Sequence, residues 1–229
     1  MRIKTVTGVS EISDRTAIAV VCDGMGGTHG GGIASEVAIN AIFERVFLSY
    51  REDMEPKSIK NLLISAITAA NSIVYNKGRE EPENRGMGTT CVVALVRDLG
   101  IYIASVGDSR AYLIGNSGIS QITRDHTVVA LLQDKGIINR DDFAAHSMKN
   151  VITRAVGVEE TVEPDYFEFS AEKGDLLLLC TDGLTNHVTD EMIYTITYRR
   201  PPQEAMADLI SAANGNGGKD DITAAIIAL

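Results

Sequence analysis

The chain has 229 residues, with 31 acidic and 21 basic side chains and a formal net charge of −10. The sequence contains no long Lys/Arg cluster of the kind that follows a phosphate backbone, which excludes nucleic-acid binding. No apolar run approaches the roughly 18 residues of a membrane span, and no signal-peptide pattern is present, so we expect a soluble, cytoplasmic protein without a membrane partner. The composition does not divide the chain, so we expect a single domain over residues 1–229, acting as a monomer.

The hydrophobic pattern predicts strands and helices in alternating groups. Strands are expected over residues 3–9, 17–22, 89–96, 101–106, 110–114, 162–169, 176–181 and 222–229. Helices are expected over residues 33–50, 56–78, 127–135, 141–146, 190–199 and 202–213. The three successive strands between residues 89 and 114 are predicted to form an antiparallel meander. Residues 125–157 carry little strand signal and are interpreted as a flap-like insertion in an α+β fold, in which helices cover antiparallel sheets.

Three cysteines, Cys22, Cys91 and Cys180, each lie in an apolar, strand-like run. Their odd number and the absence of CxxC or histidine spacing argue against a disulfide framework and against a zinc site. We therefore expect three buried free thiols, which behave as small hydrophobic side chains.

The stretch around Asp23 combines an apolar run with a glycine-rich turn. Residues 17–22 are all apolar and lead directly into Asp23, and several glycines follow before the next expected helix. Because such a run is typical of a strand buried on both faces, the packed backbone behind Asp23 holds its carboxylate in place at the sheet edge. The glycines permit close backbone approach, which leaves room for an ion beside the carboxylate. Taken alone, however, an Asp-Gly pair at a strand end is also typical of a simple turn.

The same pattern recurs elsewhere in the chain. Apolar runs end at Asp108 and at Asp182, and another apolar run begins just after Asp220. Because the end of one antiparallel strand lies beside the start of its neighbour, we expect Asp23, Asp182 and Asp220 to converge on one edge, with Asp108 joining them. The alternative is that these pairs only mark turns between strands.

A cluster of carboxylates with few nearby cations forms an oxygen-rich site, which favours Mg²⁺ or Mn²⁺ over zinc. If one carboxylate bridges two such ions, a water between them loses a proton readily, and the ions stabilise both the entering and the leaving oxygen of an in-line phosphoryl displacement. Hydrolysis then needs no side-chain nucleophile.

Seven short motifs occur along the chain. They are Asp23-Gly-Met-Gly-Gly27, Gly88-Thr-Thr90, Val106-Gly-Asp-Ser-Arg110, Asp125-His126, Val151-Ile-Thr-Arg154, Gly174-Asp-Leu-Leu-Leu-Leu-Cys-Thr-Asp-Gly183 and Gly218-Lys-Asp-Asp-Ile-Thr223. In this order, over residues 17–229, the chain resembles the bacterial PP2C-type serine/threonine protein phosphatases, also called the PPM family. The resemblance implies a four-layer α-β-β-α sandwich, with two antiparallel sheets flanked by helices. It also implies hydrolysis of phosphoserine and phosphothreonine through a metal-bridged hydroxide.

The resemblance implies a role for each matching position. Asp23 would bridge two Mn²⁺ or Mg²⁺ ions, the Gly24 carbonyl would bind one of them, and Asp182 and Asp220 would hold the other. Asp108 is similar to the ligand of a third, weaker ion, shared with Asp182. The flap-like insertion would lie near the substrate. The implied partners are phosphorylated proteins and a cognate serine/threonine kinase.

The sequence departs from the family pattern upstream of Asp23. Family members usually carry an Arg followed by an Asn-Glu-Asp or Asn-Gln-Asp segment there, and the 22 residues before Asp23 contain no such segment. Glu11, Asp14 and Arg15 are the nearby candidates, at a spacing that is too short. Either the loop is rebuilt, the chain is truncated, or phosphate binding is weakened.

A second departure concerns the histidine of the glycine loop. Bacterial relatives often have His directly after Asp-Gly-Met-Gly-Gly, whereas Thr28 stands here and His29 follows. His29 is a candidate catalytic proton donor or substrate contact, and the alternative is a solvated loop histidine. His126 is interpreted as a structural partner, and Arg110 as the partner of a carboxylate.

Two other functions compete with a metal-dependent phosphatase. A catalytically weak or inactive relative, acting as a regulatory or binding module, is favoured by the missing upstream segment, whereas the presence of all four aspartates argues against it. A nucleotide-binding protein is disfavoured because the loop lacks Gly-Lys-Ser/Thr and because His29 occupies the place of the last glycine of GxGxxG.

Overall fold

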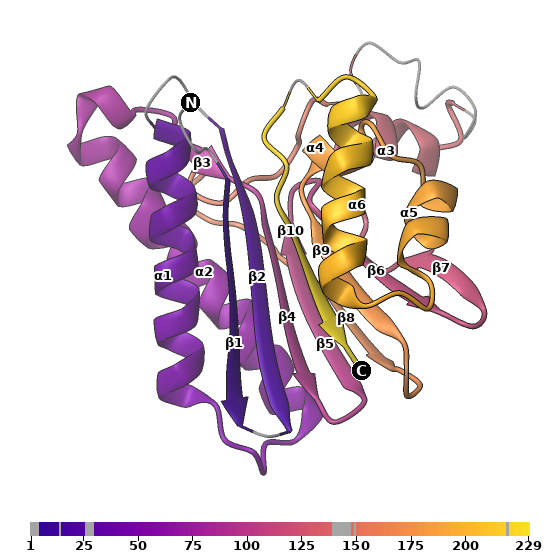
Figure 1. The fold of residues 1–229 in the computed structure, drawn as a ribbon. Coiled ribbons are helices and arrows are strands. Elements are labelled where there is room, and N and C mark those ends of the chain that lie inside the picture. Colours follow the sequence, from indigo (N-terminus) through magenta and orange to yellow (C-terminus); the bar gives the residue numbers. More distant parts are fainter. Residues whose placement is uncertain (1–4, 14, 26–29, 139–147, 149, 219) are drawn as a thin grey trace.

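The computed structural model describes residues 5–13, 15–25, 30–138, 148, 150–218 and 220–229, without side chains before residue 12. Two antiparallel sheets lie face to face, and helices cover the outer face of each sheet (Figure 1). The predicted four-layer α-β-β-α sandwich is therefore present. None of the helices in these residues combines the length and the apolarity needed to cross a bilayer.

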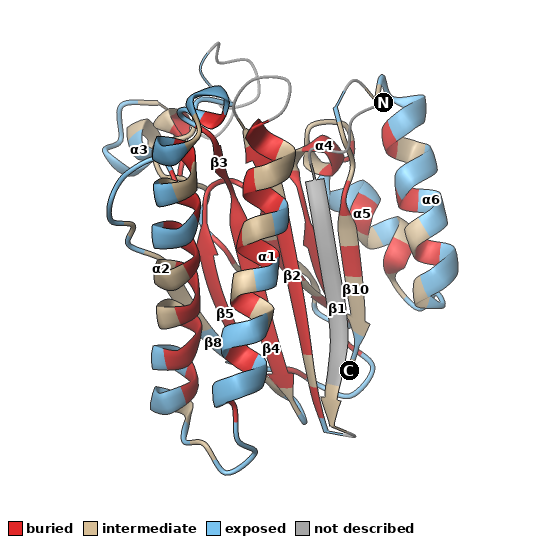
Figure 2. Cartoon of the chain, turned by 90° about the vertical axis from the view of Figure 1, so that its left-hand side faces the viewer, coloured by how far each residue is buried: buried red, intermediate tan, exposed pale blue. Residues whose placement is uncertain are grey.

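The first sheet is built around apolar strands that are buried on both faces. Its strand order is β1-β2-β4-β5-β8, and the short strand β3 pairs with β2. The bounds are Thr5–Ser13 for β1, Thr16–Met25 for β2, Gly88–Thr89 for β3, Cys91–Arg97 for β4, Gly100–Val106 for β5 and Asp165–Ser170 for β8. Residues 91–96 of β4 are all buried, and residues 18–22 of β2 are buried as well (Figure 2). This agrees with the prediction that the run before Asp23 is a central strand.

The second sheet has the strand order β10-β9-β6-β7. The bounds are Arg110–Gly115 for β6, Gly118–Gln121 for β7, Leu176–Cys180 for β9 and Ala224–Ala228 for β10. The predicted three-strand meander is wrong, because β4 and β5 pair with each other while β6 pairs with β7 and β9 in the second sheet. The chain changes sheets in the turn between β5 and β6, where Gly107 has a φ of 101° that an L side chain rarely adopts.

Helices α1 (Gly30–Ser49) and α2 (Pro56–Glu80) cover the first sheet, and η1 (Pro82–Asn84) is a short 3₁₀ turn after α2. Pro56 suits the first turn of α2, where its missing N–H has no intrahelical partner to lose. The second sheet is covered by α5 (Asp190–Thr197) and α6 (Pro202–Gly215), with the single turn α4 (Asp182–Thr185) at one end. Helix α3 (Val128–Asp134) lies in the predicted flap, and the helix predicted over residues 141–146 falls outside the described residues.

Three apolar layers hold these four layers of secondary structure together. The layer between the two sheets contains many small and β-branched side chains, among them Ala19, Val21, Val92, Ala94 and Ala111. A second layer joins the first sheet to α1 and α2, and a third joins the second sheet to α4, α5 and α6. Since burial of apolar surface is the main favourable contribution to folding, these layers fix how the two sheets face each other.

Candidate metal centre

Four aspartates lie at the same end of the two sheets, which is also the end where β3 and α4 lie (Figure 1). Asp23 lies near the end of β2, and Asp108 lies in the turn between β5 and β6. Asp182 begins α4 directly after β9, and Asp220 precedes β10. Strands β9 and β10 are antiparallel neighbours with Cys180 opposite Ala224, so the end of one lies beside the start of the other. The two sheets therefore bring together the residues that the sequence predicted to converge. The edge formed by Asp23, Asp108, Asp182 and Asp220 is called the aspartate rim below.

The charges of these carboxylates act on one another. The pKa of Asp23 is raised from 3.8 to about 8, first by burial and then by the charges of Asp182, Asp220 and Asp108. Burial and the Asp182 charge raise the pKa of Asp108 to about 7. The pKa of Asp182 is raised by burial and by Asp220. An ionised rim is therefore strained by desolvation and repulsion, and a bound cation relieves both.

The aspartate carboxylates and the Gly24 carbonyl are the type of donor that binds a hard divalent cation. The described side chains are not arranged as a complete coordination shell. In the described part of the chain, no three or more His, Cys, Asp or Glu side chains are grouped closely enough to hold a metal ion. Besides burial, the proximity of the Asp182 carboxyl is one of the causes that raise the pKa of Asp23. The donor types suit Mg²⁺ or Mn²⁺, since carboxylate and carbonyl oxygens are the ligands that these ions prefer.

Two glycines allow the backbone segments of the rim to approach closely. A Cβ on Gly31 would lie 2.7 Å from the carbonyl oxygen of Gly24, and a Cβ on Gly183 would lie 2.3 Å from that of Asp221. Both distances are shorter than van der Waals contact, so neither position has room for a side chain. The start of α1 therefore packs against Gly24, and the turn after β9 packs against the segment that carries Asp220.

The motif Gly88-Thr-Thr90 fixes the backbone of Asp23. The N–H of Asp23 donates to Oγ1 of Thr90 over 2.9 Å, and the N–H of Thr90 donates to the Asp23 carbonyl over 2.8 Å. The hydroxyl of Thr89 donates to the same carbonyl, and Oγ1 of Thr90 lies 2.7 Å from Oγ of Ser109, next to Asp108. The motif was noted in the sequence, but its role in joining these two aspartates was not predicted.

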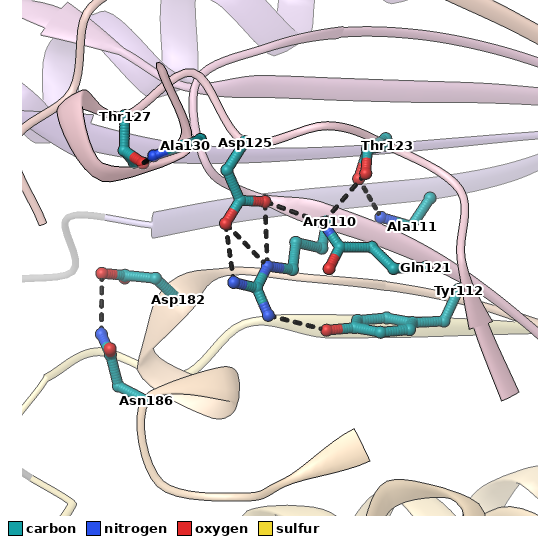
Figure 3. Close-up of polar contacts among 10 residues, drawn as sticks. All are labelled: Arg110, Ala111, Tyr112, Gln121, Thr123, Asp125, Thr127, Ala130, Asp182 and Asn186. Carbon is teal, nitrogen blue, oxygen red and sulfur yellow. Dashed lines mark hydrogen bonds and ion pairs between the residues drawn. The ribbon is translucent and has the colours of Figure 1, made fainter. Parts of the chain in front are cut away.

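Asn186 holds the carboxylate of Asp182. Its Nδ2 donates to Asp182 Oδ2 over 2.9 Å, between two residues one helical turn apart (Figure 3). The hydrophobic pattern does not predict this contact, because α4 is too short to show a hydrophobic period. The (i, i+4) spacing of an Asp and an Asn just after an apolar strand is the signal that could have revealed it.

Arg110 forms a buried ion pair with Asp125, as Figure 3 shows. Its Nε and Nη2 donate to the two carboxylate oxygens over 2.9 and 2.6 Å, and its Nη1 donates to the Tyr112 hydroxyl over 2.9 Å. Burial by itself would lower the pKa of Arg110, but the Asp125 charge outweighs it and raises that pKa. The prediction that Arg110 pairs with a carboxylate is confirmed.

His126 is also a structural partner, as predicted. Its Nδ1 accepts a hydrogen bond from the N–H of Gly107 over 3.1 Å, and its Nε2 lies 3.2 Å from Oδ2 of Asp165. Asp165 in turn accepts from Nη1 of Arg154 over 2.8 Å. Burial lowers the pKa of His126, which is therefore neutral near pH 7. His29, the candidate proton donor, lies outside the described residues.

Two of the three candidates for the missing upstream segment, Glu11 and Arg15, lie away from the rim. Arg15 pairs with Asp98 over 2.7 Å in the turn between β1 and β2, at the opposite end of the sheet from Asp23. The register of β1 places Glu11 opposite Ala17, again toward that far end. Arg15 and Glu11 are therefore wrong as substitutes for the phosphate-gripping segment, and Asp14 falls outside the described residues. The three cysteines are free and buried, as predicted.

This architecture is that of the bacterial serine/threonine phosphatases. The crystal structure of Stp1 from Staphylococcus aureus superposes with a TM-score of 0.93 and 34% sequence identity, covering 100% of this chain and 90% of that chain. The serine/threonine phosphatase stp of Listeria innocua is 37% identical over 96% of this chain and 87% of its own length. Protein phosphatase PhpP of Streptococcus pneumoniae is 34% identical over 94% of this chain and 86% of its own length.

The family model described as Protein phosphatase 2C matches residues 7–224. The chain therefore belongs to the protein phosphatase 2C family. The predicted fold class, family and phosphatase activity are confirmed, and nothing in these comparisons supports the alternative of an inactive binding module.

Proposed function

We propose that this chain hydrolyses phosphoserine and phosphothreonine in proteins, with Mn²⁺ or Mg²⁺ bound between the four aspartates. The observation that carries this proposal is the convergence of four aspartates from two sheets at one end of the sandwich. Burial and the charges of the other three aspartates raise the pKa of Asp23 to about 8. So high a value for a carboxyl group marks a site that is short of positive charge. Two divalent cations supply that charge, and a third can be held more weakly.

Each aspartate has a separate role in this proposal. Asp23 would hold both principal ions, the Gly24 carbonyl would complete one of them, and Asp182 and Asp220 would complete the other. Asp108 would hold the third ion together with Asp182. When bound, the ions neutralise phosphoryl charge and lower the pKa of water, which makes water an effective nucleophile at neutral pH.

The protein's own contribution is to hold these groups in place. Thr89 and Thr90 fix the backbone that precedes the Gly24 carbonyl, and Asn186 fixes one oxygen of Asp182. Positioned groups of this kind save the entropy of assembling the reacting atoms. The catalytic role of His29, the flap role of residues 125–157, the single-domain organisation, the cytoplasmic location, the kinase partner and the monomeric state remain predictions.

The experiment is hydrolysis of p-nitrophenyl phosphate with Mn²⁺ and with EDTA. We compare the wild-type chain with Asp23→Asn, and with Asp53→Asn as a control that removes an exposed acid in the loop between α1 and α2. Mn²⁺-dependent turnover is expected in the wild type and in the control, and a loss of at least about 100-fold is expected in Asp23→Asn. Equal, metal-independent background in all three proteins would refute the proposal.

A further inference from the structure

A pocket of about 710 Å³ lies beside the aspartate rim. Its apolar walls include Met25, Ile152, Val158 and Val162. Met25 follows Gly24 directly, so the two Cα atoms are only about 3.8 Å apart. Pockets of this volume are large enough to bind a small ligand or part of a peptide.

The wall nearest the rim is the same pair of strands that positions Gly24. Gly24 pairs with Thr89, and Met25 pairs with Gly88. A Cβ on Gly88 would lie 2.5 Å from Cγ2 of Val158 and 3.6 Å from Cγ of Met25, so both side chains pack over this glycine. The pocket therefore adjoins the end of β2 that carries Asp23 and Gly24.

The outer wall of the pocket is a loop with a fixed backbone. The buried side chain of Asn71 in α2 donates to the carbonyls of Glu159 and Glu160 over 3.0 and 3.1 Å. The same side chain accepts from the N–H of Gly157 over 2.7 Å. Further along the chain, Nη1 of Arg154 donates to the carbonyl of Glu163 over 3.0 Å. These hydrogen bonds hold the loop backbone in place, so the exposed side chains of Glu159 and Glu163 extend from a preorganised backbone.

The charges on this loop leave the pocket acidic. Glu159 and Glu163 line the pocket and are exposed, and neither carboxylate has an ion-pair or hydrogen-bond partner among the described residues. The one cation of the lining, Arg154, is already paired with Asp165 over 2.8 Å. An apolar wall with an acidic rim complements Lys or Arg, whose aliphatic stem packs on apolar surface while the charged end stays near water.

We propose that this pocket binds a Lys or Arg side chain of the phosphoprotein substrate, a proposal that rests on the phosphatase function proposed above. An extended chain advances about 3.3 Å per residue, so a basic residue close in sequence to the phosphorylated one can reach the pocket. Glu159 and Glu163 are then specificity-determining residues, which select the sequence around the phosphate.

The test compares phosphoserine peptides that differ at one position, with Lys, Ala or Glu scanned across the four residues on each side of the phosphoserine. The readout is the ratio of kcat/KM for the Lys peptide to that for the Glu peptide within each protein, which does not depend on the fraction of active enzyme. Because exposed ion pairs are screened by water, contacts to two exposed carboxylates predict a modest ratio of about three to ten at the best position. Added salt is expected to reduce the ratio.

The deciding variants are Glu159→Gln with Glu163→Gln, and Glu159→Lys with Glu163→Lys. The double Gln variant is expected to bring the ratio close to one. The double Lys variant is expected to reverse the ratio in favour of the Glu peptide. Glu191→Lys with Glu204→Lys is the matched control, because it makes the same change in net charge on α5 and α6, and it is expected to leave the ratio unchanged.

Each outcome has a distinct meaning. A wild-type ratio of one, a preference for the Glu peptide, or an equal shift in the control variant would overturn the proposal for the pocket while leaving the phosphatase function intact. Absence of Mn²⁺-dependent hydrolysis of both p-nitrophenyl phosphate and all peptides would overturn the phosphatase function, and the role of the pocket with it.

Discussion

The backbone N–H of Gly107 donates to Nδ1 of His126 over 3.1 Å, and the N–H of His126 donates back to the Gly107 carbonyl over 2.9 Å. This reciprocal pair ties the turn that carries Asp108 to the first residues of the predicted flap. It also leaves the ring proton of the neutral histidine on Nε2, facing Asp165. His126 is therefore a positioning residue rather than an acid or base in the reaction.

We predict that His126→Ala destabilises the chain by about 1–3 kcal/mol, because the buried N–H of Gly107 loses its acceptor. For a protein of this size, each kcal/mol corresponds to a decrease in Tm of about 2–4 °C. The displaced turn is also expected to raise the Mn²⁺ concentration needed for half-maximal activity. His126→Asn places an amide oxygen near the position of Nδ1, so it is expected to restore much of both properties. Thermal melting and Mn²⁺ titration check this, and an Asn variant as impaired as the Ala variant would contradict it.

The buried pair of Arg110 and Asp125 predicts strong coupling in a double-mutant cycle. Asp125→Asn leaves the guanidinium buried without its counter-charge, which we expect to cost about 3–5 kcal/mol. Arg110→Met is expected to be similarly damaging, whereas the double variant is expected to lose less than the sum of the two. The measurement is denaturant unfolding of all four proteins. Additive losses would mean that the two side chains do not act as a unit.

The pKa of Asp23 predicts the pH dependence of the metal-free chain. This pKa is 3.8 in the absence of structure and about 8 in the folded chain, so between these values the folded state binds more protons than the unfolded state. The stability that comes from the protonated carboxyl is complete below about pH 4 and is lost as the pH rises toward about 8. Asp108, with a pKa of about 7, contributes in the same direction.

In EDTA, we therefore expect Tm to decrease between pH 5 and pH 8, and Mn²⁺ to restore it at the upper end. Asp23→Asn is expected to flatten this dependence, because an amide does not ionise. Melting curves recorded at several pH values provide the check. Parallel curves for the wild type and the variant would show that Asp23 is not the group responsible.

The close approach at Gly183 predicts damage from a single methyl group. Gly183→Ala places a Cβ against the Asp221 carbonyl, and overpacking of this kind costs about 1–3 kcal/mol. Because Asp182 and Asp220 flank this contact, we also expect a weaker response to Mn²⁺. Gly215→Ala is the control, since its Cβ would meet nothing within 4 Å at the end of α6. Equal stability and equal Mn²⁺ response in both variants would argue against the contact.

The parts of the fold that could be predicted are those with a strong local pattern. The apolar run 17–22 and the apolar stripe of α2 each contain enough residues to define their own period. The convergence of Asp182 and Asp220 followed from strand polarity alone, because antiparallel neighbours place an end beside a start. The family motifs supplied the rest of the candidate site.

The parts that could not be predicted depend on contacts between distant residues. Strand β6 has the same local pattern whether it pairs with β5 or crosses to the other sheet, so its true partners were missed. Strand β7 is a four-residue strand with no buried residue, and α4 is a single turn, so neither shows a hydrophobic period. Arg15 was considered for the site because it is close to Asp23 in sequence, whereas the length of β2 separates them.

The proposed metal ligands come from both halves of the sandwich: Asp23 belongs to the first sheet, whereas Asp182 and Asp220 flank strands of the second. The interior between the sheets, including Ala19 and Leu177, is consequently the spacer that sets the width of the ion-binding gap. Replacing an alanine of this layer by a larger side chain would push the two sheets apart without contacting any proposed ligand. Activity can thus be lost through substitutions at interior positions that contact no proposed ligand.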